Sequence, residues 1–330
     1  MNRLLAGLAF LALLLLAAAP LAVSQGLLKL FAEILLVYTM AQMWNLLAGY
    51  AGLMSLGHQA FVGVGAYSLF FVANRFEVPA YYAIPAAALA SALMAALIAP
   101  LVFRLRDAYF AIGMWVFAEI LRLLTGNTEA LRSNMGMPLS AIRHMHRDWF
   151  APISYWCALG LAGGTALMMV WLMRSKLGLG LRAVRDNELA AGSLGVDVWR
   201  ARFIAFVLSG TVCGMAGGTY FMTTLYVDPN SGFDVNWMVI MLFIAVIGGI
   251  GTLTGPAIGT AVYFATRELL PLEGSWYLVL MGGVAVATML LAPRGIWGYL
   301  GPKFAAARAQ ARNGGQTPGM AMASNPGLAE

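Results

Sequence analysis

One charged segment divides a chain that otherwise consists of long apolar runs. Residues 174–202 carry six basic and three acidic side chains. On both sides lie apolar runs long enough to cross a bilayer, which takes about 20 residues in a helix. A basic loop between membrane helices normally stays in the cytoplasm. The sequence therefore predicts an all-α polytopic membrane protein with residues 174–202 on its cytoplasmic side.

The composition supports a membrane protein. The 330 residues are 61% hydrophobic and only 10% charged, whereas soluble domains carry about 25% charged residues. The net charge of +6 does not indicate nucleic acid as a partner, because the basic residues lie between apolar runs and set topology. Cys157 and Cys213 fall inside apolar runs, where we interpret them as small core residues. We expect the lipid bilayer as a partner and no nucleic acid.

The apolar runs predict about ten membrane helices. The stretch 235–270 gives nine spans in total if it is one helix, and ten if it is two short spans around residues 248–251. The first run, which follows Arg3, also resembles a secretory signal peptide, but it is long enough to span and we interpret it as a helix. The clear candidate spans are 4–23, 27–47, 58–74, 80–103, 108–126, 152–173, 201–222 and 275–292.

Charge favours ten spans over nine. With ten, the basic tail beyond Pro293 lies on the same side as residues 174–202, and both termini are cytoplasmic, as the positive-inside rule prefers. The loop 127–150 then lies outside although it contains three arginines. We expect residues 1–301 to form one transmembrane domain and residues 302–330, rich in small and polar residues, to form a disordered cytoplasmic tail.

Two glycine-rich segments, 49–55 and 248–254, share the pattern G-x-x-G-x-(M/L)-(S/T) and break apolar runs. Glycine in a helix costs about 1 kcal/mol relative to alanine. Matching breaks in two halves of a membrane chain indicate a weak internal repeat and a transport pathway, although tight helix packing is an equal alternative. A structural role for His58 is favoured over a ligand role. The candidate pathway or gate residues are Gly49, Gly52, Ser55, Gly57, His58, Gly248, Gly249, Gly251 and Thr254.

Ionisable residues are scarce within the predicted spans. Glu119 and Arg122 lie three positions apart on one helical face, so we predict an intramembrane ion pair, with a substrate or proton role as the alternative. So few carboxylates argue against a carrier driven by protons or sodium. The chain lacks G-x-x-x-x-G-K-[ST], H-E-x-x-H and G-x-S-x-G motifs and any cysteine–histidine cluster. We therefore expect no catalytic residue, no metal site and no cofactor of its own.

Four blocks together resemble the second permease subunit of high-affinity branched-chain amino acid ABC importers, over roughly residues 25–300. The blocks are residues 49–67, residues 107–112 with 117–122 and the Met135-Gly136 loop, residues 181–195, and residues 246–256, followed by the closing segment 293–298.

The charged segment also contains the sequence D-N-E-L-A-A-G-S-L-G-V, which overlaps the third block. This sequence predicts a short helix closed by a glycine, which is a suitable contact for a partner protein.

The resemblance implies partners and a coupling segment. The partners would be a homologous permease in a heterodimer, two cytoplasmic ATPase subunits that use the ATP, and a periplasmic binding protein, all at a bacterial inner membrane. The third block is similar to the E-A-A-x-x-x-G coupling loop of ABC importers, except that its acid lies one position early and Leu189 takes the usual place. The implied coupling residues are Arg182, Arg185, Asp186, Asn187, Glu188, Ala190, Ala191 and Gly195.

The mechanism implied by the resemblance is alternating access, in which ATP binding moves the segment 186–195 and rocks the helix bundle. Branched-chain or other apolar amino acids are the expected substrates, with urea, amides and aromatic acids as alternatives. Two other classes stay open from the residues alone. A stand-alone secondary carrier would depend on an ion gradient and have no ATPase partner, and a membrane scaffold would transport nothing.

Overall fold

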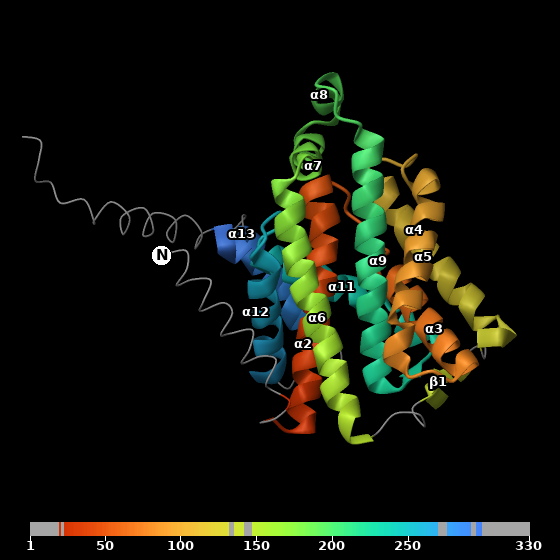
Figure 1. Ribbon diagram of the computed structural model, residues 1–330. Helices are drawn as coiled ribbons and strands as arrows, with labels where there is room; N and C mark the ends of the chain where they lie inside the picture. Colours follow the sequence, from red (N-terminus) through yellow and green to blue (C-terminus); the bar gives the residue numbers. More distant parts are fainter. Residues whose placement is uncertain are drawn as a thin grey trace, which may run out of the picture.

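Helices make up almost all of the structure (Figure 1). The computed structural model describes Pro20 and residues 23–131, 135–141, 147–269, 276–291 and 295–298. The all-α prediction is confirmed for these residues, while the predicted span 4–23 falls almost wholly outside them and the predicted tail 302–330 entirely so. The main helices are α2 (Gln25–Asn45), α3 (Gln59–Phe76), α4 (Ile84–Val102), α5 (Asp107–Gly126), α6 (Arg147–Arg174), α7 (Lys176–Asp186), α8 (Glu188–Ser193), α9 (Val198–Thr224), α10 (Pro229–Gly232), α11 (Val235–Gly248), α12 (Gly255–Leu269) and α13 (Trp276–Leu291).

Short elements connect these helices. A π-helical turn, η1 (Leu46–Ala51), continues α2, and one-turn 3₁₀ helices occur as η2 (Ala80–Ala83) and η3 (Glu129–Leu131). The strands β1 (Met137–Pro138) and β2 (Tyr226–Val227) pair antiparallel, with Met137 opposite Val227. The hydroxyl of Tyr226 donates to the carbonyl oxygen of Met135 at 2.7 Å. These contacts hold the described part of the loop 127–150 against the end of α9.

The long helix α9 lies at the centre of the bundle and contacts α2, α3, α4 and α6. Small residues allow this close packing. A side chain on Gly65 of α3 would overlap the backbone of Gly214 of α9, and a side chain on Gly214 would overlap Ser91 of α4. Ala87 and Ala95 of α4 are fully buried. The glycine and alanine content of these runs thus sets the distances between helices.

The charged segment folds into α7, α8 and the start of α9, and each helix begins at a side-chain cap. The hydroxyl of Ser175 accepts from the amide of Gly178, and the side-chain oxygen of Asn187 accepts from the amide of Ala190 at 3.0 Å. Asp197 caps α9 in the same way. The predicted short helix is confirmed as α8, and the closing glycine Gly195 has a left-handed φ of 86°.

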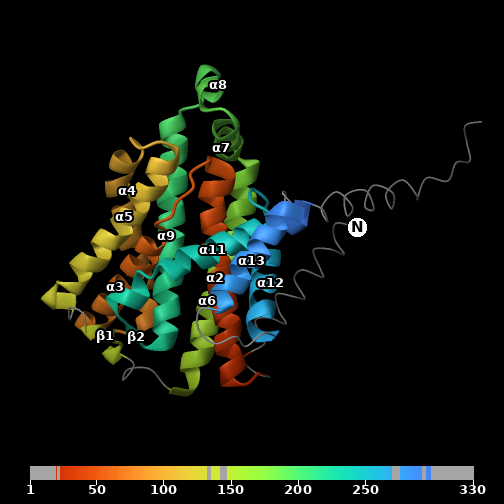
Figure 2. The same cartoon turned by 180° about the vertical axis from the view of Figure 1, so that it is seen from behind.

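The two ends of the bundle carry different structures. Figures 1 and 2 show α7 and α8 at one end, with α8 projecting beyond the long helices, and β1 and β2 at the opposite end. Because β1 lies within the loop 127–150, this part of the loop is opposite the charged segment, as a single predicted span at 152–173 between them requires.

The ambiguous stretch 235–270 forms two helices, α11 and α12, which pack against each other and are separated at residues 249–254. The alternative of one continuous span is therefore wrong. Among the described residues, six helices are long and apolar enough to cross a membrane, whereas α3, α12 and α13 fall outside these limits. The chain is a multi-pass membrane protein, and the total of ten spans stays a prediction. The six are 25–51, 80–102, 107–126, 149–174, 198–224 and 229–248.

Candidate functional site

The predicted coupling residues lie on α7 and α8, at the projecting end of the molecule. Glu188 accepts a hydrogen bond from Arg202 of α9 at 3.0 Å between Oε2 and Nη1, which fixes α8 to the central helix. Ala191 is on the buried side of α8, whereas Leu189 and Leu194 are 84% and 83% exposed. Leu189 of α8 and Leu194 at its C-terminal cap are thus exposed apolar side chains at the projecting end of the molecule.

Arg185 connects α7 to the first glycine-broken segment. Its Nη1 donates to the carbonyl oxygen of Gly49 at 2.8 Å, and its Nε and Nη2 bind Asp186 Oδ1 at 2.9 and 2.7 Å. Gly52 has a left-handed φ of 72°, and a Cβ there would lie 3.3 Å from the Cα of Arg185. Arg182 donates to the carbonyl oxygen of Met173 at 2.9 Å. The coupling segment and the break at 49–55 are therefore in direct contact.

The two glycine-broken segments also contact each other. The side-chain oxygen of Asn45 accepts from the amide of Gly251 at 2.8 Å, and its nitrogen donates to the carbonyl oxygen of Thr252 at 2.9 Å. A side chain on Gly49 would overlap both the backbone of Gly251 and the side chain of Asn45. We call the contact of Asn45, Gly49, Gly251, Thr252 and Arg185 the glycine junction. It brings both halves of the sequence pattern beneath α7.

Asn45 is a site residue that the sequence analysis missed. It is fully buried and lies four positions before Gly49, at the end of α2. A polar amide inside an apolar run is itself a signal, because buried amides need hydrogen-bond partners. The glycine pattern itself begins at Gly49 and does not include this position.

A cavity of about 550 Å³ lies beside the glycine junction. Its walls come from α7, from both broken segments and from the described segment 295–298. Thr254, one of the candidate pathway residues, faces it, as do Gly251 and Arg185. The other two glycines of the second break, Gly248 and Gly249, allow close packing. A side chain on Gly248 would overlap the backbone of Gly255, and a side chain on Gly295 would overlap the backbone of Gly249.

His58 and Ser55 lie in the interior, away from this cavity. The Nε2 of His58 is 2.8 Å from Ser209 Oγ, and the hydroxyl of Ser209 donates to the carbonyl oxygen of Met43 at 2.9 Å. Nε2 therefore carries the proton and donates to Ser209. His58, Ser55 and Ser209 are fully buried. These contacts join α2, α3 and α9, while the neighbouring Gly57 allows the backbone of Met114 in α5 to approach closely.

We predict that Ser209→Ala destabilises the bundle by about 1–3 kcal/mol, because the buried Nε2–H of His58 then loses its acceptor. The measurement is the midpoint of thermal denaturation of the purified protein in detergent. Thr211→Ala is the matched control, since that hydroxyl donates only to Val207 in its own helix. An equal decrease of the denaturation midpoint in the two variants would show that the hydrogen bond between Ser209 and His58 does not stabilise the bundle.

The predicted ion pair of Glu119 and Arg122 forms in the second half of α5, beside α10. Arg122 Nη2 is 2.6 Å from Glu119 Oε1, and Arg122 Nη1 donates to Asn230 of α10 at 2.7 Å. Both side chains of the pair are part-exposed, so the pair ties two elements together at one end of the bundle. Within the described ranges, no group of three His, Cys, Asp or Glu side chains is placed to hold a metal ion.

Comparisons with known proteins match this chain to a permease family. The family model described as "Branched-chain amino acid transport system / permease component" matches residues 26–290. The high-affinity branched-chain amino acid transport system permease protein LivM of Salmonella typhimurium is 27% identical over 328 residues, covering 91% of this chain and 77% of that protein. LivM of Escherichia coli is 28% identical, with 86% and 73% covered.

More distant similarity extends to another transporter class. The guanosine ABC transporter permease protein NupQ of Bacillus subtilis is 26% identical over 155 residues, which cover 47% of each chain. No solved structure matches. Because the family model spans most of the chain, the protein belongs to the branched-chain amino acid transport permease family and is the non-catalytic permease component of an ABC transporter.

Proposed function

We propose that this chain is one of two homologous permease subunits of a bacterial inner-membrane importer for branched-chain or related apolar amino acids. Membership in an ABC permease family implies separate ATPase and binding-protein partners. In the proposed importer, a periplasmic protein delivers the amino acid and two cytoplasmic ATPase subunits use the ATP. The two LivM relatives, which match most of the chain, support this substrate class more than NupQ, which matches about half.

The proposed orientation places α7, α8 and both termini in the cytoplasm. It rests on the basic charge of residues 174–202 and of the tail, since basic loops are retained on that side. β1, β2 and the ion pair of Glu119 with Arg122 then lie at the periplasmic end, where the binding protein would dock.

The observation that carries the proposal is the hydrogen bond from Arg185 to Gly49. A partner that moves α7 and α8 pulls on this guanidinium, and Gly49 passes the displacement to Gly251 through their close backbone contact. The ion pair of Glu188 with Arg202 passes the same motion to α9. In this mechanism the glycine junction is the gate that changes which side of the membrane the pathway opens to.

The exposed leucines of α8 provide the test of this proposal. We expect Leu189→Asp combined with Leu194→Asp to reduce co-purification of the ATPase subunits at least about tenfold, because fully burying one leucine side chain contributes about 1.5–3 kcal/mol and about 1.4 kcal/mol corresponds to a factor of ten. The measurement is affinity purification of the tagged chain from native membranes, with each ATPase subunit quantified.

Met135→Asp is the matched control for the leucine variants. Met135 is 86% exposed and shortly precedes β1, which lies at the end of the bundle opposite α8 (Figure 1), so we expect this variant to retain the ATPase subunits. Full retention of these subunits by the double-leucine variant, or their absence from the wild-type preparation, would contradict the proposed role of α8.

A further inference from the structure

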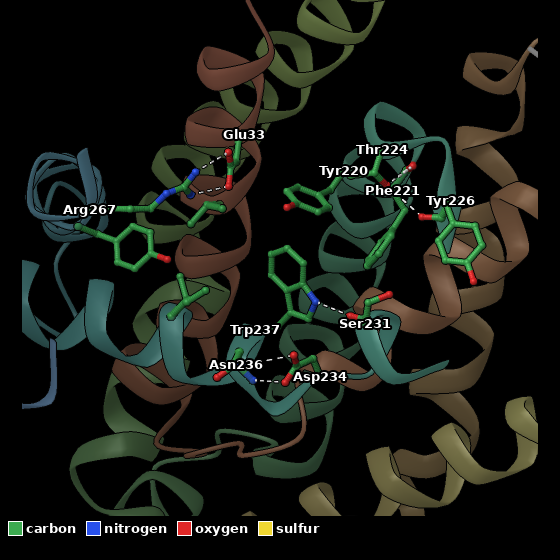
Figure 3. A pocket seen from close by; sticks show the side chains of 13 residues that line it. Glu33, Tyr220, Phe221, Thr224, Tyr226, Ser231, Asp234, Asn236, Trp237 and Arg267 are labelled. Carbon is green, nitrogen blue, oxygen red and sulfur yellow. Dashed lines mark hydrogen bonds and ion pairs between the residues drawn. The ribbon is translucent and has the colours of Figure 1, made fainter. Parts of the chain in front are cut away.

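A second cavity, of about 510 Å³, lies between α2, α9, α11 and α12, in the half of the molecule opposite α8 (Figures 1 and 3). Small-molecule sites commonly have volumes of about 300–1,000 Å³. Its walls combine one ion pair with an aromatic and aliphatic face, and none of its lining residues belongs to the glycine junction. Neither the glycine pattern nor the charged segment 174–202 contains any of its lining residues.

The charged wall consists of Glu33 from α2 and Arg267 from α12. Arg267 Nη1 is 2.6 Å from Glu33 Oε1, and Nη2 is 3.2 Å from Oε2. The side chains are 35% and 24% exposed for Arg267 and Glu33, so both charges remain accessible from the cavity. While the site is empty, the two groups satisfy each other, which lowers the cost of holding charges inside a membrane bundle.

The apolar wall faces this pair across the cavity, as Figure 3 shows. The indole of Trp237 packs edge-on against the ring of Tyr220 at 4.6 Å between centroids. Its Nε1 donates to the carbonyl oxygen of Ser231 at 2.9 Å, which fixes the ring. Ile240 of α11 and Val37 of α2, one turn from Glu33, also line the cavity. A rigid aromatic surface next to a pair of opposite charges matches a ligand with one apolar end and one end that carries both a positive and a negative group.

Asp234 is the remaining carboxylate in the wall, and it already has a structural role. Its Oδ1 accepts from the backbone amide of Asn236 at 2.9 Å, and its Oδ2 accepts from the Asn236 side chain at 3.1 Å. Asp234 therefore caps α11, whereas Glu33 and Arg267 form the ion pair in the opposite wall.

We propose that this cavity is a subsite of the permease for a zwitterionic amino acid with an apolar side chain. Arg267 binds the ligand carboxylate, Glu33 binds the ammonium group, and Trp237 with Tyr220 takes the side chain. Charge-assisted hydrogen bonds of this kind are among the strongest in proteins. The inference rests on the proposed function, because an importer of this orientation receives the amino acid at its periplasmic half, where this cavity lies.

Direct binding separates this ligand class from others. Radiolabelled L-leucine is equilibrated with the purified full-length chain in detergent, and unlabelled competitors with the same isobutyl side chain are added. 4-Methylpentanoate lacks the ammonium group and 3-methylbutylamine lacks the carboxylate. We expect saturable binding that unlabelled L-leucine displaces at a concentration at least about tenfold lower than either competitor, since each lacks one charged hydrogen bond. Absence of saturable binding, or equal displacement by all three, overturns the inference.

Charge variants then distinguish recognition from structural support. Glu33→Gln and Arg267→Gln are each expected to weaken L-leucine binding at least about tenfold. The double swap Glu33→Arg with Arg267→Glu restores an ion pair and therefore the yield of folded protein, but it reverses the charges offered to the ligand, so binding stays lost. Asp197→Asn removes an ion-paired carboxylate outside the cavity and is the matched control with unchanged binding.

Two results would overturn the subsite while leaving the proposed function intact. They are wild-type L-leucine binding by the double swap, and wild-type L-leucine binding by Glu33→Gln when a separate affinity purification shows that this variant retains the ATPase subunits. Failure of the proposed function has a different signature, which is the absence of ATPase subunits from the wild-type preparation. Leucine binding is measured on the chain alone, so the two questions are scored independently.

Discussion

Gly49→Ala is expected to abolish amino acid uptake and to destabilise the protein by about 1–3 kcal/mol, the usual cost of forcing extra volume into a packed interior. The added Cβ would overlap the backbone of Gly251 and the side-chain oxygen of Asn45. Backbone cannot move aside as a flexible side chain can, so the two broken segments must separate. The measurements are uptake of radiolabelled L-leucine by cells carrying the complete importer and thermal denaturation of the purified chain.

Gly160→Ala is the matched control for this substitution. Gly160 lies in α6, and a Cβ there would meet nothing within 4 Å. Alanine stabilises a helix interior by about 0.5–1 kcal/mol relative to glycine, so we expect full uptake and equal or greater stability. Normal uptake by Gly49→Ala would show that the glycine junction is not closely packed in the working protein.

Arg185→Ala is expected to lower the initial uptake rate at least about tenfold at equal amounts of assembled complex. The substitution removes the guanidinium that binds the carbonyl oxygen of Gly49. A hydrogen bond to a charged group contributes about 1.5–3 kcal/mol, and 1.4 kcal/mol corresponds to a factor of ten. Because the exposed leucines of α8 remain, the ATPase subunits still bind. The measurement is uptake in cells, normalised to the complex recovered from their membranes.

The control for Arg185 is Arg200→Ala. Arg200 belongs to the same basic segment, but it pairs with Asp197 at the start of its own helix, at 3.0 Å between Nε and Oδ2. We expect this variant to transport at nearly the wild-type rate. If Arg200→Ala and Arg185→Ala lost uptake equally, the basic charge of the segment would matter rather than the contact with Gly49.

The parts of this structure that the sequence predicts are those with local causes. Asn187 and Asp197 cap their helices through the next turn of the same chain, so the start of α8 and of α9 can be inferred from a few residues. The break at 249–254 follows from glycines that adopt left-handed backbone, such as Gly251 at a φ of 75°. The length of the apolar runs predicts a membrane protein, and the placement of charged residues between them predicts which loops lie at the same end of the bundle.

The site depends on contacts between distant parts of the chain, and here local patterns do not suffice. Asn45 meets Gly251 across 206 positions, and Glu33 meets Arg267 across 234. His58 illustrates the same limit. The sequence favours a structural role for it, but no local pattern reveals its partner Ser209, which lies 151 positions away in α9.

The most direct test of the proposed coupling is the number of amino acid molecules taken up per ATP hydrolysed. It is measured in proteoliposomes that contain the complete importer with either the wild-type chain or Arg185→Ala. The proposed mechanism predicts that ATP hydrolysis persists in the variant while uptake per ATP falls at least about tenfold, since the link to Gly49 is lost. An unchanged ratio would contradict the claim that α7 drives the glycine junction through Arg185.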